Sequence, residues 1–377
     1  MRLALFLHCY QPSTQFPDVF HRVVRECYEP IVSILEANTN SCITLNISGA
    51  LVEQLGMSYG GLLGRIKSLQ TLGRVDLTGS ACYHPLLPYI PDDEIRRQVR
   101  LNEQIYKTNF GIVIPEGSGF FAPEMSINKH VCQVIKEMGY SYTMADESVL
   151  PMGKKDCLNQ SRVFIDKDSG LKIVCRHKNL SLDIAFSKLR SISEFLDLTA
   201  GMPYVILAMD AETFGHHRPE QMELLRSMLQ YYVISDNLKL IKLLNLLEAE
   251  PPVEIDVAKS CWGEGFKRWD NCENKIHTAQ WKLLNLAIKA VNEYPERDGA
   301  YWEARGLLDK GLQSDQFWWA SSNPCWHYKM VDRGASLLKE AVQMLPGEFP
   351  AKKEAEDLYK EITETGLKLY GDTVVSC

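Results

Sequence analysis

The feature that most constrains the fold is an alternation, over the first two-thirds of the chain, of short apolar segments with longer amphipathic ones. The short segments have the length of buried strands, and the longer ones have helical periodicity. Strands are expected at residues 3–7, 43–47, 75–78, 119–122, 140–144, 173–175, 205–209 and 253–257. Helices are expected at residues 19–35, 51–69, 93–109 and 127–138, the last closed by Gly139. Repeated strand–helix units predict an α/β fold with a parallel sheet, and seven or eight strands suit a (β/α)7-type barrel.

The last third of the chain has a different pattern, in which helical segments follow one another without strands. These helices are expected at residues 274–294, 301–312, 328–345 and 351–369, with breaks at Pro295, Pro346 and Pro350. We therefore expect a barrel over residues 1–260 and a C-terminal helical bundle over residues 261–377, with no long linker between them.

Charge and cysteine usage exclude several classes of protein. The formal charge of −7 argues against a nucleic-acid partner, because such proteins carry a basic excess. The apolar start of the chain breaks at His8 without a cleavage site, and no run approaches the length of a membrane span, so we expect a soluble, cytoplasmic protein without a membrane partner. Eleven scattered cysteines without a C-x-x-C pair predict reduced thiols, and neither a metal nor a cofactor is expected.

The apolar run at residues 205–209 ends in Asp210 and Glu212, followed by Gly215, His216 and His217. Acids rarely end a buried strand unless they are solvated, paired or functional. Because capping one helix does not require two acids followed by two histidines, we interpret Asp210 as a functional carboxylate.

Three other predicted strands also run directly into polar residues. The first leads into His8 and Gln11, the third into His84, and the fourth into Glu124. Each residue has an ordinary structural interpretation: a histidine beside a strand is often only hydrogen-bonded, and Glu124 could simply favour the start of the next helix. Their shared position at strand ends, where the loops of a barrel gather, favours a common site.

Two carboxylates at one rim are suited to breaking a glycosidic bond, since one acid protonates the leaving oxygen while the other attacks or shields the anomeric carbon. Sugars also bind to flat apolar surfaces. The later part of the chain offers candidates for such surfaces, although an aromatic residue belongs more often to a core than to a site: Trp262, Trp269, Trp302, Trp318, Trp319 and Trp326.

The order and spacing of five segments resemble the motifs of glycoside hydrolase family 57. These segments are His8 to Pro12, Gly79 to Pro85, Phe121 to Glu124, Asp210 to Gly215, and Asp315 to Trp318. The resemblance implies a seven-stranded barrel with a helical domain that contributes to the active-site cleft, and retaining action on α-glycosidic bonds.

The same resemblance implies roles for individual residues. Glu124 matches the catalytic nucleophile and Asp210 the general acid/base, while Trp262 and Trp269 resemble the loop between the two domains. The positions that match sugar-binding residues are His8, Gln11, His84, Glu212, Asp315 and Trp318. The chain departs from the family pattern at Tyr10, where a second histidine is common, and at Phe121, where a tryptophan is common.

The predicted activity is that of an α-amylase or 4-α-glucanotransferase acting on α-glucan or malto-oligosaccharides. An α-galactosidase of the same family is the alternative. A metal-dependent deacetylase or mannosidase on a related barrel, and a glycan-binding protein without turnover, are further alternatives. The motifs leave open the exact linkage, the balance of hydrolysis and transfer, the oligomeric state and the roles of His216 and His217.

Overall fold

The structure is a computed structural model that describes residues 1–159, 161–230, 238–263, 265–321, 326–372 and 374–375. It divides into two compact units. Unit 1 comprises Met1–Gln11, Phe16–Cys82 and Leu87–Trp262. Unit 2 comprises Pro12–Gln15, Tyr83–Leu86 and Gly263–Cys377, so two short excursions from unit 1 belong to it.

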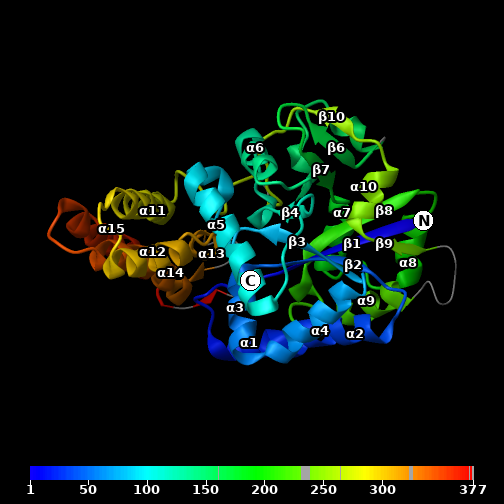
Figure 1. The fold of residues 1–377 in the computed structure, drawn as a ribbon, viewed down its shortest axis with the longest axis horizontal. Coiled ribbons are helices and arrows are strands. Elements are labelled where there is room, and N and C mark those ends of the chain that lie inside the picture. The colour runs from blue at the N-terminus through cyan, green and yellow to red at the C-terminus, as the bar shows by residue number, and fades with distance from the viewer. Residues whose placement is uncertain (160, 231–237, 264, 322–325, 373, 376–377) are drawn as a thin grey trace. The chain divides into compact units, whose positions relative to one another are not determined.

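Seven parallel strands form the centre of unit 1 (Figure 1). Their spatial order is β8-β1-β2-β3-β4-β5-β7, and each neighbouring pair is parallel. The strands are β1 (Arg2–Cys9), β2 (Ile43–Ile47), β3 (Val75–Ser80), β4 (Gly119–Phe121), β5 (Tyr142–Ala145), β7 (Lys172–Cys175) and β8 (Tyr204–Asp210). The predicted α/β barrel is therefore confirmed.

The ring closes between β7 and β8 through a few hydrogen bonds made by the residues that follow β7. The His177 N–H donates to the carbonyl of Ile206 at 2.8 Å, and the Ile206 N–H donates to Nδ1 of His177 at 3.0 Å. Nη1 of Arg176 donates to the carbonyl of Ala208 at 3.2 Å. We call this closure the seam of the barrel.

Three further strands lie outside the ring. β6 (Val163–Asp166) runs antiparallel to β7, β10 (Val253–Ile255) pairs with β6, and β9 (Lys239–Ile241) pairs with the start of β1. The expected strand at residues 253–257 thus exists, but it extends the sheet beyond β6 instead of joining the ring. β6 and β9 were not predicted from the sequence.

Ten α-helices accompany these strands in the described part of unit 1. They are α1 (Pro17–Val23), α2 (Glu29–Ala37), α3 (Gly49–Ser58), α4 (Gly60–Thr71), α5 (Asp92–Ile105), α6 (Lys129–Glu137), α7 (Lys178–Ala185), α8 (Ile192–Leu198), α9 (Gln221–Gln230) and α10 (Leu243–Ala249). The sequence did not predict the last four of them.

Three of the expected helices differ from the structure in instructive ways. The helix expected at 19–35 contains a π-helical segment, Val24–Tyr28, and the end of the helix expected at 93–109 becomes a second one, Tyr106–Phe110. The helix expected at 51–69 breaks at Tyr59, whose non-helical φ of −137° and ψ of 39° stand just before two glycines. α6 lies within the helix expected at 127–138: Asn128 caps its start by accepting from the Val131 N–H, and Gly139, expected to close it, follows with a φ of +93°.

Alternate residues of the barrel strands pack into one buried cluster. On β1 these are Ala4 and Phe6, and on β8 they are Tyr204, Ile206 and Ala208. Successive side chains of a strand point to opposite faces, so the next residues in each series, His8 and Asp210, lie on that same face at the carboxyl ends. This alternation positions the polar residues of the rim above the apolar interior.

Unit 2 is mainly helical. Its helices are α11 (Lys275–Glu293), α12 (Gly299–Gly311), α13 (Asp315–Trp319), α14 (Tyr328–Met344) and α15 (Pro350–Tyr370). α14 packs against α12 and α15, and α11 packs against α15. A small antiparallel pair joins β11 (Trp326–His327) to β12 (Val374–Val375). Side-chain caps from Asn274 and Asp298 begin α11 and α12, which explains their sharp starts.

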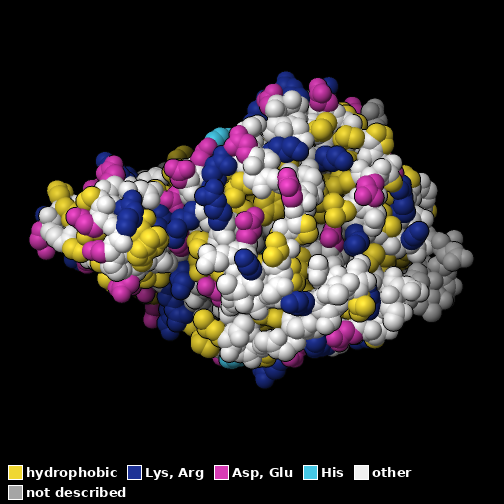
Figure 2. Space-filling view, viewed as in Figure 1, with side chains coloured by type: hydrophobic (Ala, Val, Ile, Leu, Met, Phe, Trp, Pro, Cys, Tyr) yellow, Lys and Arg dark blue, Asp and Glu magenta, His cyan; other side chains and the backbone are white. Residues whose placement is uncertain are grey.

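Acidic and basic side chains are interspersed over the face that Figure 2 shows, as the small net charge of the chain leads one to expect. Within the described residues, the helices all fall short of the length and hydrophobicity that crossing a membrane requires.

Candidate active site

The carboxyl ends of β1 and β8 bring two predicted site residues side by side. The strands are parallel neighbours, and His8 is the register partner of Asp210. Asp210 is the last residue of β8 and is half-buried, whereas the preceding residues of the strand are buried. The strand that begins in the apolar interior therefore ends with a carboxylate at the rim.

His8 is buried and is fixed in one tautomer by its neighbour on β2. Nδ1 of His8 lies 2.8 Å from Oδ1 of Asn46, and the Asn46 amide nitrogen donates to Oγ1 of Thr78 at 3.0 Å. Because Oδ1 of Asn46 is an acceptor, Nδ1 of His8 carries the proton and Nε2 is an acceptor. Burial lowers the pKa of His8 to about 4, so the ring is neutral near pH 7.

Glu124 lies in a tight turn, Pro123–Met125, directly after β4. The backbone φ is +59° at Glu124 and +48° at Met125, a region that residues other than glycine seldom adopt. Hydrogen bonds hold the turn in this shape: the Met125 N–H donates to the carbonyl of Ala122 at 2.8 Å, and Oγ of Ser126 donates to that of Pro123 at 2.6 Å.

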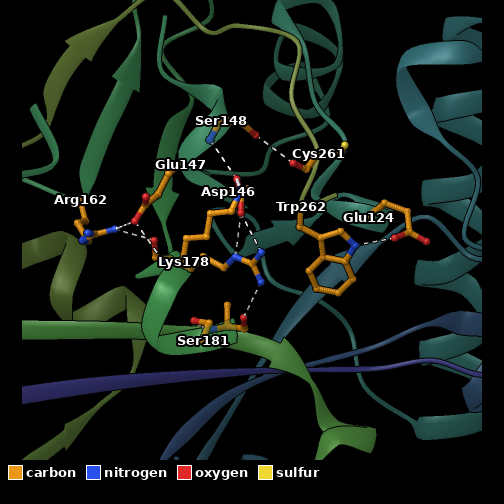
Figure 3. A network of polar contacts seen from close by, with 11 residues as sticks. Glu124, Asp146, Glu147, Ser148, Arg162, Lys178, Ser181, Cys261 and Trp262 are labelled. Carbon is orange, nitrogen blue, oxygen red and sulfur yellow. Dashed lines mark hydrogen bonds and ion pairs between the residues drawn. The ribbon is translucent and has the colours of Figure 1, made fainter. Parts of the chain in front are cut away.

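The side chain of Glu124 is oriented by Trp262 (Figure 3). The indole N–H of Trp262 donates to Oε2 of Glu124 at 2.6 Å, and the Trp262 backbone N–H donates to the Glu124 carbonyl at 3.0 Å. Trp262, which was predicted to bind sugar, is half-buried. It also contacts a predicted catalytic carboxylate directly through its indole N–H.

Aromatic rings connect the two predicted catalytic residues within unit 1. The ring of His8 stacks on Phe121 at a centroid distance of 4.3 Å, and its centroid lies 6.1 Å from that of Trp262. His8 is beside Asp210 in the sheet, and Trp262 is bonded to Glu124. Both carboxylates therefore border one aromatic surface at the rim of the barrel.

Glu212 is 5% exposed and accepts hydrogen bonds from several donors. The hydroxyl of Tyr28, the backbone N–H of Tyr10 at 3.2 Å and the amide of Gln11 at 3.4 Å all donate to its Oε1. Burial raises the pKa of Glu212, and these donors oppose that rise by stabilising the carboxylate. The structure thus brings Gln11 and Glu212 together, and their role in binding sugar stays a prediction.

The predicted residues of unit 2 form a second group. Nδ1 of His84 lies 3.0 Å from Oγ of Ser314, and the Ser314 N–H donates to the His84 carbonyl at 2.9 Å. His84 also has a positive φ, +59°. Asp315 and Trp318 follow on α13, and both are half-buried.

Trp269 is more buried than Trp262 and Trp318, the other two tryptophans predicted to bind sugar. Its side chain is buried, and only 2% of its surface is exposed. A sugar ring could stack on it only if the side chain left this position, so its predicted role in binding sugar stays a prediction.

The histidines after Asp210 contact protein groups. Nδ1 of His216 lies 2.7 Å from Oε2 of Glu26, and the His217 N–H donates to the carbonyl of Glu212 at 2.8 Å. Burial lowers the pKa of His217 to about 4. Within the described residues, no group of three or more His, Cys, Asp or Glu side chains is arranged to hold a metal ion.

Sequence reasoning missed a buried ion pair at the same rim. Asp146 follows β5 and Arg176 follows β7, and two hydrogen bonds of 2.8 and 3.1 Å join them. A looser form of the rule that identified Asp210, a polar residue within two residues of the end of a predicted strand, applies to both of them. It would have found them, since residues 144 and 174 of the same strands belong to the buried cluster.

The fold and the rim define the class of protein: a (β/α) barrel with carboxylates at the ends of its strands β4 and β8, as in enzymes that cleave glycosidic bonds. The family model described as Glycosyl hydrolase family 57 matches residues 5–258, and the chain belongs to this family.

Three relatives illustrate the likeness. An α-amylase of Pyrococcus horikoshii is 27% identical over 141 residues, which are 37% of this chain and 22% of that enzyme. The crystal structure of 4-α-glucanotransferase from Thermococcus litoralis has a TM-score of 0.74 at 16% identity, covering 92% of this chain and 59% of the other. A family 57 branching enzyme of Thermococcus kodakaraensis has a TM-score of 0.71 at 15% identity, covering 96% and 94%. The chain thus matches only 22% of the length of the curated amylase.

Proposed function

We propose that the protein is a retaining glycosidase that acts on α-glucan or malto-oligosaccharides by hydrolysis or by 4-α-glucanosyl transfer. The observation that carries the proposal is the shared aromatic surface: His8, beside Asp210, stacks on Phe121, and Trp262 contacts both rings and bonds Glu124. Support for an α-glucan substrate comes from the relatives, whose names are α-amylase and 4-α-glucanotransferase.

In this proposal the reaction is a double displacement. A carboxylate oxygen of Glu124 attacks the anomeric carbon, and the bond to the leaving oxygen breaks as Asp210 transfers its proton to that oxygen. Asp210, now ionised, takes a proton from water or from a sugar hydroxyl, whose oxygen displaces Glu124. The hydrogen bond from Trp262 supports the first step because it restricts the plane of the attacking carboxylate.

The remaining predicted residues would bind the substrate. Nε2 of neutral His8 can accept a hydrogen bond from a sugar hydroxyl. Gln11 and Glu212 can bind a second sugar hydroxyl between them. For unit 2, the motif resemblance leads us to propose that His84, Asp315 and Trp318 also contact the glucan.

The test is substitution of the two carboxylates, with malto-oligosaccharides as substrate. Asp210→Asn should lower kcat by about 100-fold or more, because a positioned acid–base group contributes that much. Glu124→Gln should cost at least as much, because an amide cannot form the glycosyl-enzyme intermediate. Added azide should restore turnover of both alanine variants. Glu124→Ala should then form a glycosyl azide of inverted configuration, and Asp210→Ala one of retained configuration. This difference in product separates the nucleophile from the acid/base. Glu36→Gln, at an exposed ion pair with Arg65, is the control for loss of a carboxylate.

Two results would contradict the proposal. Normal turnover by either carboxylate variant would refute the assigned roles. Cleavage of a nitrophenyl α-galactoside together with inertness toward malto-oligosaccharides would refute the substrate class. Within the proposal, products longer than the substrate indicate transfer, and uniform shortening indicates hydrolysis.

A further inference from the structure

We propose that Arg176, held by Asp146, is a positioning residue for Glu124 and acts through the indole ring of Trp262. The inference rests on the proposed role of Glu124 as nucleophile. Figure 3 shows the geometry: the Trp262 side chain lies between Glu124 on one side and the polar group around Asp146 on the other.

The ion pair is fully enclosed. The side chain of Asp146 is completely buried and that of Arg176 is 4% exposed. Nε and Nη2 of Arg176 donate to Oδ2 of Asp146, Nζ of Lys178 donates to Oδ1 at 3.1 Å, and Nη1 of Arg176 reaches the Ala208 carbonyl across the seam. Three barrel strands therefore fix the guanidinium in place. Buried ion pairs of this kind often stabilise a fold no more than apolar residues of equal volume, so stabilisation of the fold is by itself a weak reason for this pair.

The guanidinium acts on the ring of Trp262. Its central carbon lies 5.6 Å from the ring centroid, within the range of a cation–π interaction, while Phe121 contacts the ring edge-on at 5.8 Å. These contacts restrict the ring to one orientation. A cation near the indole π system also withdraws electron density, which makes the N–H a better donor to the carboxylate of Glu124.

The main chain that carries Trp262 is held separately. The Ala258 N–H donates to the carbonyl of Val149, the Ser260 N–H to that of Ile127, and Oγ of Ser148 to that of Cys261, at 2.9 to 3.0 Å. Removing the guanidinium should therefore leave this segment in place and release only the ring. The expected defect is a misdirected carboxylate, not an unfolded loop.

The first experiment observes the contact without relying on turnover. In the full-length protein labelled with ¹⁵N-tryptophan, the indole resonance of Trp262 is assigned by its loss in Trp262→Phe. We expect Glu124→Gln and Arg176→Met each to move it upfield, since each weakens the hydrogen bond of the indole N–H. An unmoved resonance in Arg176→Met would overturn the inference.

The second experiment is a double-mutant cycle on malto-oligosaccharides. Arg176→Met should lower kcat by about 10- to 100-fold with KM nearly unchanged, the effect expected when a reacting group is misplaced. In a Trp262→Phe background the same substitution should change kcat by less than about twofold, because the path to Glu124 is already cut. Equal losses in both backgrounds would refute action through Trp262.

Two further variants keep the test decisive. Asp146→Leu combined with Arg176→Met replaces the pair by apolar groups and should fold even if Arg176→Met alone does not. Arg305→Met removes a comparably buried arginine, paired with Asp309 at 3.1 Å in α12, and should leave both the Trp262 resonance and kcat unchanged. If Glu124→Gln keeps normal activity, the proposed function fails, whereas the resonance shifts still report whether Arg176 orients Trp262.

Discussion

Single residues at the proposed site depart from ordinary backbone and ionisation behaviour. Among the described residues, four that are not glycine have a positive φ, and three of them, His84, Glu124 and Met125, lie in or beside predicted site segments. Such conformations cost about 1–3 kcal/mol each and persist where surrounding contacts impose them. His8 is unusual in another way, because burial keeps it neutral over most of the pH range in which histidine ordinarily titrates.

The lowered pKa of His8 predicts a pH dependence of stability. Between the unfolded pKa near 6.5 and the folded value of about 4, the unfolded chain binds a proton that the native His8 does not. This group's contribution to stability is therefore present above pH 6.5 and falls as the pH drops toward 4. Compared with His8→Gln, the wild type should lose up to about 1.4 kcal/mol more unfolding free energy per pH unit in this window. Urea unfolding at several pH values measures the difference, and parallel curves would contradict it.

At the scale of elements, the π-helical segment Val24–Tyr28 holds the loop that follows Asp210. The wider turn, closed by the Glu29 N–H on the Val24 carbonyl, lets three consecutive residues reach that loop. Glu26 bonds His216, Sγ of Cys27 donates to the Ala211 carbonyl at 3.0 Å, and Tyr28 bonds Glu212. A regular helix would turn at least one of these side chains away.

The close packing of the π-helical segment on this loop leaves no room for a side chain at Gly215. Gly215 has a φ of +97°, and a Cβ there would overlap the carbonyl oxygen of Glu26. Gly215→Ala should lower the free energy of unfolding by about 3 kcal/mol or more, combining backbone strain with a clash, and should reduce kcat by displacing the loop. Gly201→Ala is the matched control, because Gly201 has a φ of +81° with open space around it and should lose only about 1 kcal/mol. Equal losses in the two variants would show that no clash occurs.

Within unit 1 as a whole, the seam is the weakest junction between neighbouring strands of the barrel. Other neighbouring strands share backbone ladders, whereas β7 and β8 are joined through His177, Arg176 and Ser181. The Ile206 N–H donates to Nδ1 of His177, so that nitrogen must be unprotonated. Burial accordingly lowers the pKa of His177 to about 3.

Hydrogen exchange should detect this weakness. The amides of Ile206 and Ala208 face the seam, whereas those of Val205 and Leu207 alternate toward β1 and serve as controls in the same strand. We expect faster exchange at the seam amides. His177→Phe should accelerate it further and cost about 1–3 kcal/mol, because the Ile206 N–H loses its acceptor. Uniform exchange along β8 would contradict the prediction.

The sequence by itself determined the repeated strand–helix order, the seven strands of the ring and the polar residues that end them. It did so because buried strands and amphipathic helices carry their periods locally, and because parallel strands of a barrel bring their carboxyl ends to one rim. The strands β6 and β9 and the π-helical segments were not predicted from the sequence.

Only the tertiary structure decided which polar residues meet. Trp262 bonds Glu124 over a separation of 138 residues, Tyr28 bonds Glu212 over 184, and the Asp146–Arg176 pair spans two non-consecutive strands. No local pattern specifies such contacts, since they depend on strand register, on a strained turn at Glu124 and on the segment that carries Trp262. The sequence pattern thus identifies the candidate carboxylates, whereas their orientation depends on the folded barrel.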